Sequence, residues 1–159
     1  MSSLEDGPTG LSKRRFEPSL VLWGFALNLV WEFAQSPLYA DHVKGWLYLA
    51  WTRFHCTLGD VLILLGAFWA TAAACRSWRW PVSRGNAAAA MFVVAGLLYT
   101  SWSEWFNTTV RESWSYAPAM PTVLGLGLSP LLQWLVLPPL LLLILRASAK
   151  RAASTGGIE

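Results

Sequence analysis

Residues 57–75, TLGDVLILLGAFWATAAAC, form a run of 19 residues that is mostly apolar and carries a single charged side chain, Asp60. An α-helix rises about 1.5 Å per residue, so a helix of this length crosses the roughly 30 Å hydrocarbon layer of a membrane. The run contains no proline that would break such a helix. We therefore predict a membrane-spanning helix here, and similar runs on both sides of it decide the fold.

Three further apolar runs accompany this one. The first extends over residues 18–36, the third over 86–106 and the last over 122–145. Glycines and Pro130 interrupt the last run, which favours an irregular segment over 118–128 followed by a spanning helix over about 130–146. The sequence thus predicts four transmembrane helices.

The composition favours a membrane protein over a soluble one. Hydrophobic residues make up 55% of the chain and charged residues 13%, against about 25% charged residues in soluble proteins. A soluble domain of this length could not bury so much apolar surface, whereas a lipid bilayer solvates it. We predict an all-α integral membrane protein, a four-helix transmembrane bundle over 18–146 between flexible tails at 1–17 and 147–159.

A polar and aromatic stretch, residues 38–56, separates the first two runs. Its large apolar side chains recur with helical spacing and share one side of a helix. They are Trp46, Leu47, Ala50, Trp51 and Phe54. This pattern predicts a short amphipathic helix that lies in the membrane interface on the outer side.

The basic side chains predict the orientation. With four crossings, nine lysines and arginines fall on one side of the membrane and three on the other. The nine are Lys13, Arg14, Arg15, Arg76, Arg79, Arg84, Arg146, Lys150 and Arg151. An excess of positive charge marks the cytoplasmic side, so we expect both termini in the cytoplasm and the protein in the cell (inner) membrane. These short groups form no continuous basic stripe, which argues against a nucleic-acid partner.

Three acids, Glu32, Asp60 and Glu104, lie within the predicted helices. Each costs on the order of 3 kcal/mol to insert, so it needs a structural or functional reason. Polar side chains share the helical faces of two of these acids. Asn28 and Gln35 lie on the face of Glu32, and Thr100 and Asn107 lie on the face of Glu104. On the last helix, Gln133 follows Pro130. All lie in the predicted outer half of the membrane, while the inner halves of the helices are almost wholly apolar.

This asymmetry predicts a site that opens to the outer side and takes a lipid-like or apolar small molecule. We expect Glu32, Glu104 and Asp60 to perform any acid–base chemistry, with Asp60 held ionised by Arg53. The expected ligand-binding residues are Asn28, Trp31, Gln35, Trp105, Asn107 and Gln133. We expect no cofactor, and no metal site, because the histidines and cysteines lack ligand spacing.

Two alternatives remain open at this stage. The acids could belong to a transporter of protons or metal ions, and since polar groups occupy only half of the crossing, a homo-oligomer would then have to complete the path. They could also simply cross-link helices in a structural or assembly subunit that has no site, because buried amides and carboxyls form interhelical hydrogen bonds.

Overall fold

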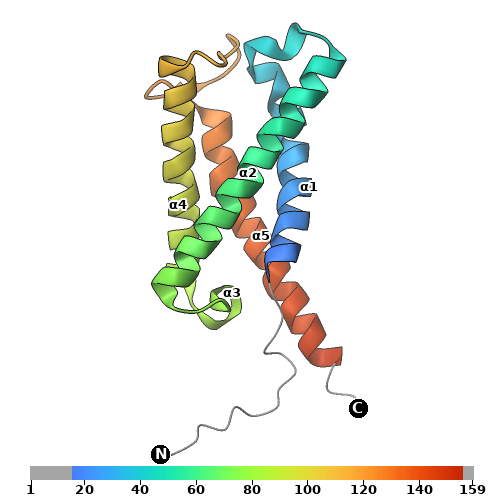
Figure 1. The fold of residues 1–159 in the computed structure, drawn as a ribbon, viewed down its shortest axis with the longest axis vertical. Helices are drawn as coiled ribbons and strands as arrows, with labels where there is room; N and C mark the ends of the chain where they lie inside the picture. Colours follow the sequence, from blue (N-terminus) through green and yellow to red (C-terminus); the bar gives the residue numbers. More distant parts are fainter. Residues whose placement is uncertain (1–15, 156–159) are drawn as a thin grey trace, which may run out of the picture.

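The computed structural model describes residues 16–155, which form a bundle of four long helices (Figure 1). The helices are α1 (Glu17–Gln35), α2 (Trp46–Cys75), α4 (Asn86–Trp105) and α5 (Leu128–Thr155). α1 and α4 each pack against both α2 and α5. The predicted all-α class is confirmed.

Short segments join these helices at the two ends of the bundle. At one end the helical turn α3 (Trp80–Ser83) lies between α2 and α4. At the other end the 3₁₀ turns η1 (Ser36–Leu38) and η2 (Ala40–Val43) connect α1 to α2, and the π-helical turn η3 (Phe106–Val110) follows α4. We call the two ends the α3 end and the loop end. The start of α1 and the finish of α5 both lie at the α3 end (Figure 1).

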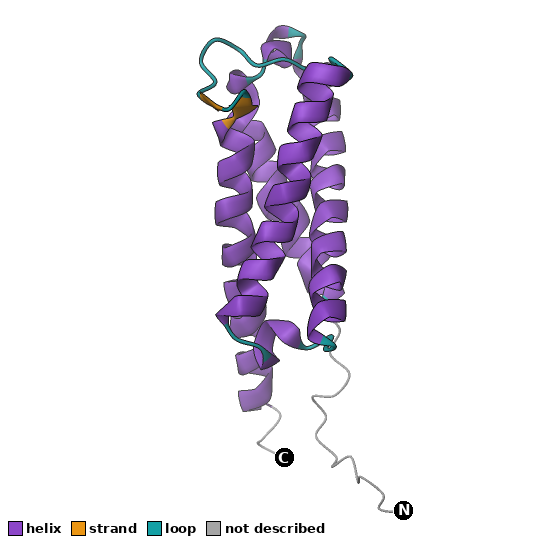
Figure 2. Ribbon diagram, turned by 90° about the vertical axis from the view of Figure 1, so that its left-hand side faces the viewer, coloured by secondary structure: helices purple, strands orange, loops and turns teal. Residues whose placement is uncertain are grey.

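A small antiparallel hairpin precedes α5 at the loop end (Figure 2). Its strands are β1 (Thr122–Val123) and β2 (Leu126–Gly127). Leu124 and Gly125 between them have φ of 52° and 80°, and two successive residues with positive φ are typical of a type I′ turn. The segment over 118–128, expected to be irregular, thus contains this hairpin.

The structure corrects the predicted interfacial helix over 38–56. Residues 46–56 are the first turns of α2, which continues without interruption to Cys75. Gly45, with φ of 95°, stands immediately before the helix, and no proline follows within it. Because nothing breaks the backbone hydrogen bonds near residue 56, the amphipathic stretch and the apolar run form a single helix of 30 residues.

The last helix is also longer than predicted. α5 begins at Leu128 and continues past residue 146 to Thr155. Alanine, lysine and arginine, all good helix formers, dominate residues 146–153 and prolong the helix. Residues 147–155 are therefore helical, and the predicted tail over 1–17 lies mostly outside the described residues.

The half of the bundle toward the α3 end is packed with apolar side chains. Trp80 lies between Phe68 and Phe92, with ring centroids 5.5 and 5.3 Å away. Leu20, Leu64, Leu141 and Leu145, from α1, α2 and α5, are at most 2% exposed. The core of this half, as far as the structure describes the chain, is therefore predominantly apolar.

The outward faces of the helices are apolar. Large exposed hydrophobic side chains occur on all four long helices, for example Leu22, Leu62, Leu98 and Leu143, each more than 60% exposed. Two helices, Trp46–Cys75 and Leu128–Ser154, are long and apolar enough to cross a membrane. An apolar exterior around a partly polar interior is the reverse of the arrangement in a soluble bundle.

Gly96 on α4 provides a test of this packing. A Cβ atom at Gly96 would lie 2.1 Å from Cζ3 of Trp134 on α5, whereas one at Gly66 on α2 would meet nothing within 4 Å. We expect Gly96→Ala to lower the free energy of unfolding by about 1–3 kcal/mol through overpacking, and Gly66→Ala to have little effect. Unfolding of the purified protein in detergent measures both, and equal losses would contradict this packing.

Candidate functional site

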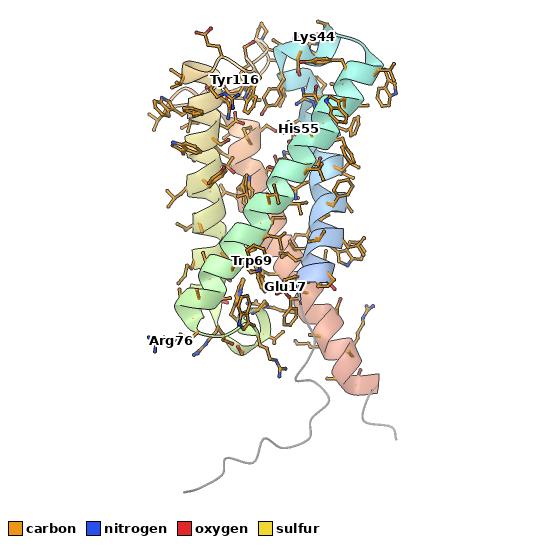
Figure 3. The ribbon with its side chains drawn as sticks, in the orientation of Figure 1. Glu17, Lys44, His55, Trp69, Arg76 and Tyr116 are labelled. Atoms are coloured by element: carbon orange, nitrogen blue, oxygen red, sulfur yellow. The ribbon has the colours of Figure 1, made fainter. Side chains whose placement is uncertain are left out.

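A cavity of about 450 Å³ lies among the four long helices at the loop end. Each helix contributes a polar side chain to its lining: Glu32 from α1, Asp60 from α2, Glu104 from α4 and Gln133 from α5. His55 of α2, which also lines it, lies at the same end of the bundle as Tyr116 (Figure 3). Residues far apart in the sequence therefore meet at a single site.

Arg53 is the buried cation of this site. Its side chain is 3% exposed, and its Nη1 lies 3.6 Å from Oε2 of Glu32. Its Nη2 donates to Oδ1 of Asp41 at 2.5 Å, and the guanidinium lies 5.0 Å from the centroid of the Tyr39 ring. Arg53 thus joins α1, α2 and η2. The predicted partner of Arg53 was Asp60, but its two ion pairs are with Glu32 and Asp41.

Gln133 links the carboxyl and amide groups of three helices. Its Nε2 donates to Oδ1 of Asn28 at 2.7 Å and to Oδ2 of Asp60 at 2.9 Å. Its Oε1 lies 3.5 Å from Nε2 of Gln35, which also donates to Oε1 of Glu32 at 2.6 Å. The hydroxyl of Ser129 donates to Oε1 of Gln35 at 2.8 Å. α5 is therefore fixed to α1 and α2 by polar contacts at this end.

Glu104 is held by a tyrosine from the loop that follows α4. The hydroxyl of Tyr116 donates to Oε2 of Glu104 at 2.5 Å. Burial, and then the hydrogen bond to Glu104, raise the pKa of Tyr116, so the phenol keeps its proton and remains a donor. Asp60 and Glu104 accept hydrogen bonds from neutral donors, the Gln133 amide and the Tyr116 phenol. Glu32 differs, because the Arg53 guanidinium also lies beside it.

The loops at this end contact each other above the cavity. The Ala40 amide donates to the Ser115 carbonyl at 3.0 Å, and the Ala117 amide donates to the Leu38 carbonyl at 2.9 Å. The rings of Tyr39 and Tyr116 pack with centroids 5.7 Å apart. The segment after α1 thus positions the loop that carries Tyr116.

Most of the site residues expected from the sequence meet here. The cavity is lined by Glu32, Gln35, Asp60, Glu104, Asn107 and Gln133. Asn28 lies behind Gln133 and binds its amide. The two expected tryptophans are not in the lining: Trp105 is 49% exposed on α4, and Trp31 is half-buried on α1.

Other lining residues were missed in the sequence. The site also uses Asp41, Trp134 and Tyr116 in its lining or its hydrogen bonds, and none of the three was expected there. Asp41 lies in the short 3₁₀ turn η2 and Tyr116 in a loop, where α-helical spacing gives no signal. Arg53 was expected from the sequence as the partner of Asp60, but its pairing with Glu32 and Asp41 was not predicted.

Four lining residues keep buried polar atoms without a hydrogen-bond partner among the described residues. The atoms are Nε of Arg53, Oγ1 of Thr100, Nε1 of Trp114 and Nε1 of Trp134. The residues Arg53, Thr100 and Trp134 are more than nine-tenths buried, and Trp114 is half-buried. An unsatisfied buried donor costs about 1–3 kcal/mol, so these groups favour a bound molecule that offers hydrogen-bond acceptors.

Buried polarity is confined almost entirely to this end of the bundle. Among the described residues, the buried polar side chain toward the α3 end is Thr71, whose hydroxyl donates to the Ala67 carbonyl of its own helix. No group of three or more histidine, cysteine, aspartate or glutamate side chains within residues 16–155 is arranged to hold a metal ion. The geometry therefore provides a carboxyl- and amide-lined cavity at one end of the bundle.

Comparison with known proteins adds no identification. No protein-family model matches the chain, and no match was found among the curated proteins or the solved structures. The function must therefore be argued from the cavity itself.

We predict that Arg53 is required for stability. Arg53→Met should lower the free energy of unfolding by about 3–5 kcal/mol, because it leaves Glu32 and Asp41 without their buried cation. Arg111→Met, at an exposed arginine on the rim of the same cavity, is the matched control and should change stability by less than about 0.5 kcal/mol. Similar losses in the two variants, measured by unfolding in detergent, would refute this role.

Proposed function

We propose that the protein is a multi-pass protein of the cell (inner) membrane whose four long helices all cross the bilayer. The exposed apolar side chains on each of these helices support this proposal. So does the distribution of basic residues: Arg76, Arg79 and Arg84 lie at the α3 end, whereas Lys44 and Arg111 lie at the loop end (Figure 3 labels Arg76 and Lys44). The α3 end then faces the cytoplasm, and the cavity opens toward the outer side.

The function that the site supports best is binding of a lipid-like small molecule that carries a polar group. The decisive observation is the convergence of carboxyl groups from α1, α2 and α4 and an amide from α5 on one cavity. Four acids and two arginines line it, namely Glu32, Asp41, Asp60, Glu104, Arg53 and Arg111. This surplus of acids favours a protonatable or cationic polar group on the ligand.

The same groups allow acid–base chemistry on the bound molecule. Asp60 of α2 and Glu104 of α4 both line the cavity, and they accept hydrogen bonds from a neutral amide and a neutral phenol, respectively. A carboxyl group in such surroundings can give a proton to a ligand or take one from it. The apolar packing toward the α3 end argues against a proton path through a single copy of the chain.

Labelling of single cysteines tests the topology. In a Cys56→Ser, Cys75→Ser background, Glu112→Cys should react with a membrane-impermeant maleimide added to intact cells. Ser77→Cys should react only after the membrane is opened. Both residues lie in connections between long helices, and both would react alike if the helices did not separate the two compartments.

Binding of a cationic amphiphile tests the site. We expect N-dodecylethanolamine to bind the protein in lipid nanodiscs, and Glu104→Gln to weaken binding about tenfold or more, because a charge-assisted hydrogen bond contributes about 1.5–3 kcal/mol. Glu112→Gln, at an exposed loop acid outside the cavity lining, should bind normally. Equal binding by both variants and the wild type, or preferential binding of dodecanoate, would overturn the proposed function.

A further inference from the structure

A second cavity, of about 500 Å³, lies between α2 and α4 beside the acidic one. Its lining is almost wholly apolar and includes Leu62, Gly66 and Ala70 of α2 and Ala95 and Tyr99 of α4. Leu62 is 68% exposed and Tyr99 50%, so the rim of this cavity lies on the outer surface of the bundle. We call it the α2–α4 groove.

The groove adjoins the acidic cavity. Gly59, Ile63 and Ser103 line both. Thr100, whose buried hydroxyl has no partner among the described residues, lies on α4 between the groove residues Tyr99 and Ser103 and lines the acidic cavity. A polar compartment therefore adjoins an apolar one whose rim lies on the outer surface of the bundle.

The glycines of the groove are not needed for helix packing. A Cβ atom at Gly24 would lie 2.8 Å from Leu64, and one at Gly96 would lie 2.1 Å from Trp134, so these two glycines allow close contact between helices. At Gly59 and Gly66 a Cβ atom would meet nothing within 4 Å. Since neighbouring helices do not require their small size, these two glycines keep space open.

The course of α2 explains why the space exists. α2 runs diagonally across the bundle, close to α1 near its start and close to α4 near its finish (Figure 1). The two helices α2 and α4 thus diverge toward the loop end, where the acidic cavity lies. The groove is lined by residues between 59 and 70 of α2 and between 95 and 103 of α4, before the two helices come together near the α3 end.

We propose that the α2–α4 groove holds the apolar chain of an amphiphile whose polar group sits in the acidic cavity, so that the ligand enters sideways from the surrounding lipid. This inference rests on the proposed function and adds the ligand class, a single-chain amphiphile, and its route. A linear chain suits a narrow groove lined by glycine and alanine. The shared residues Gly59, Ile63 and Ser103 let one molecule occupy both compartments.

Photolabelling tests where the chain lies. The probe is N-dodecylethanolamine with a diazirine in the middle of its chain, added to the full-length protein in nanodiscs. We expect crosslinks on α2 between residues 59 and 70 and on α4 between residues 95 and 103, removed by excess unlabelled N-dodecylethanolamine. Crosslinks spread evenly over the outer faces of all the helices would overturn the proposal.

A blocked groove provides the second test. A Cβ atom at Gly66 meets nothing within 4 Å, and we expect Gly66→Leu to fill the groove while the protein folds and unfolds as the wild type does. We expect it to weaken binding of N-dodecylethanolamine about tenfold, which corresponds to about 1.4 kcal/mol, and to leave binding of N-butylethanolamine unchanged. Ala26→Leu, on the exposed face of α1, is the matched control and should bind both normally.

The outcomes separate the two proposals. Unchanged binding of the dodecyl compound to Gly66→Leu, together with a loss in Glu104→Gln, would refute the groove and leave the acidic site standing. If neither Gly66→Leu nor Glu104→Gln weakened binding of N-dodecylethanolamine, both the groove and the acidic site would be refuted. A change in oligomeric state of Gly66→Leu, measured by light scattering, would show that a second copy of the chain covers the groove and would also refute the proposal.

Discussion

A carboxyl group buried among apolar helices must find a donor or a cation, and this requirement organises the loop end of the bundle. Glu32 has Arg53 and Gln35, Asp60 has Gln133, and Glu104 has Tyr116. Each partner lies on a different segment from its acid, except Gln35, which lies one helical turn after Glu32 on α1. The acids therefore determine where α1, α2, α4 and α5 can lie relative to each other at this end.

The α3 end follows a different principle. There the helices pack through large side chains and through glycines that allow close approach, as at Gly24 and Gly96. Dispersion and shape complementarity hold this half together, and such packing tolerates no internal water. The molecule thus combines a dry apolar half with a polar half that encloses a cavity. The change between them occurs close to the consecutive residues Gln133 and Trp134 of α5.

This division favours a receptor for an amphiphile over a conduit. Apart from the indoles of Trp31 and Trp80, the buried polar atoms without partners in the described part of the chain belong to residues that line the acidic cavity. The open side between α2 and α4 adds an apolar compartment to the polar one. A molecule with both a polar group and a chain matches the two compartments, whereas an ion moving across the membrane would meet the core around Phe68 and Phe92.

The sequence by itself determined the helical class, the approximate position of each long helix and the confinement of polar groups to one end, because hydropathy and helical spacing are local properties. It also singled out Glu32, Asp60 and Glu104, since acids in apolar runs are rare. Only the tertiary structure decided that Arg53 pairs with Glu32 and Asp41, that Tyr116 reaches Glu104, and that Trp31 and Trp105 lie outside the cavity. These facts depend on how helices rotate and cross, and on irregular loops, which no periodicity in the sequence records.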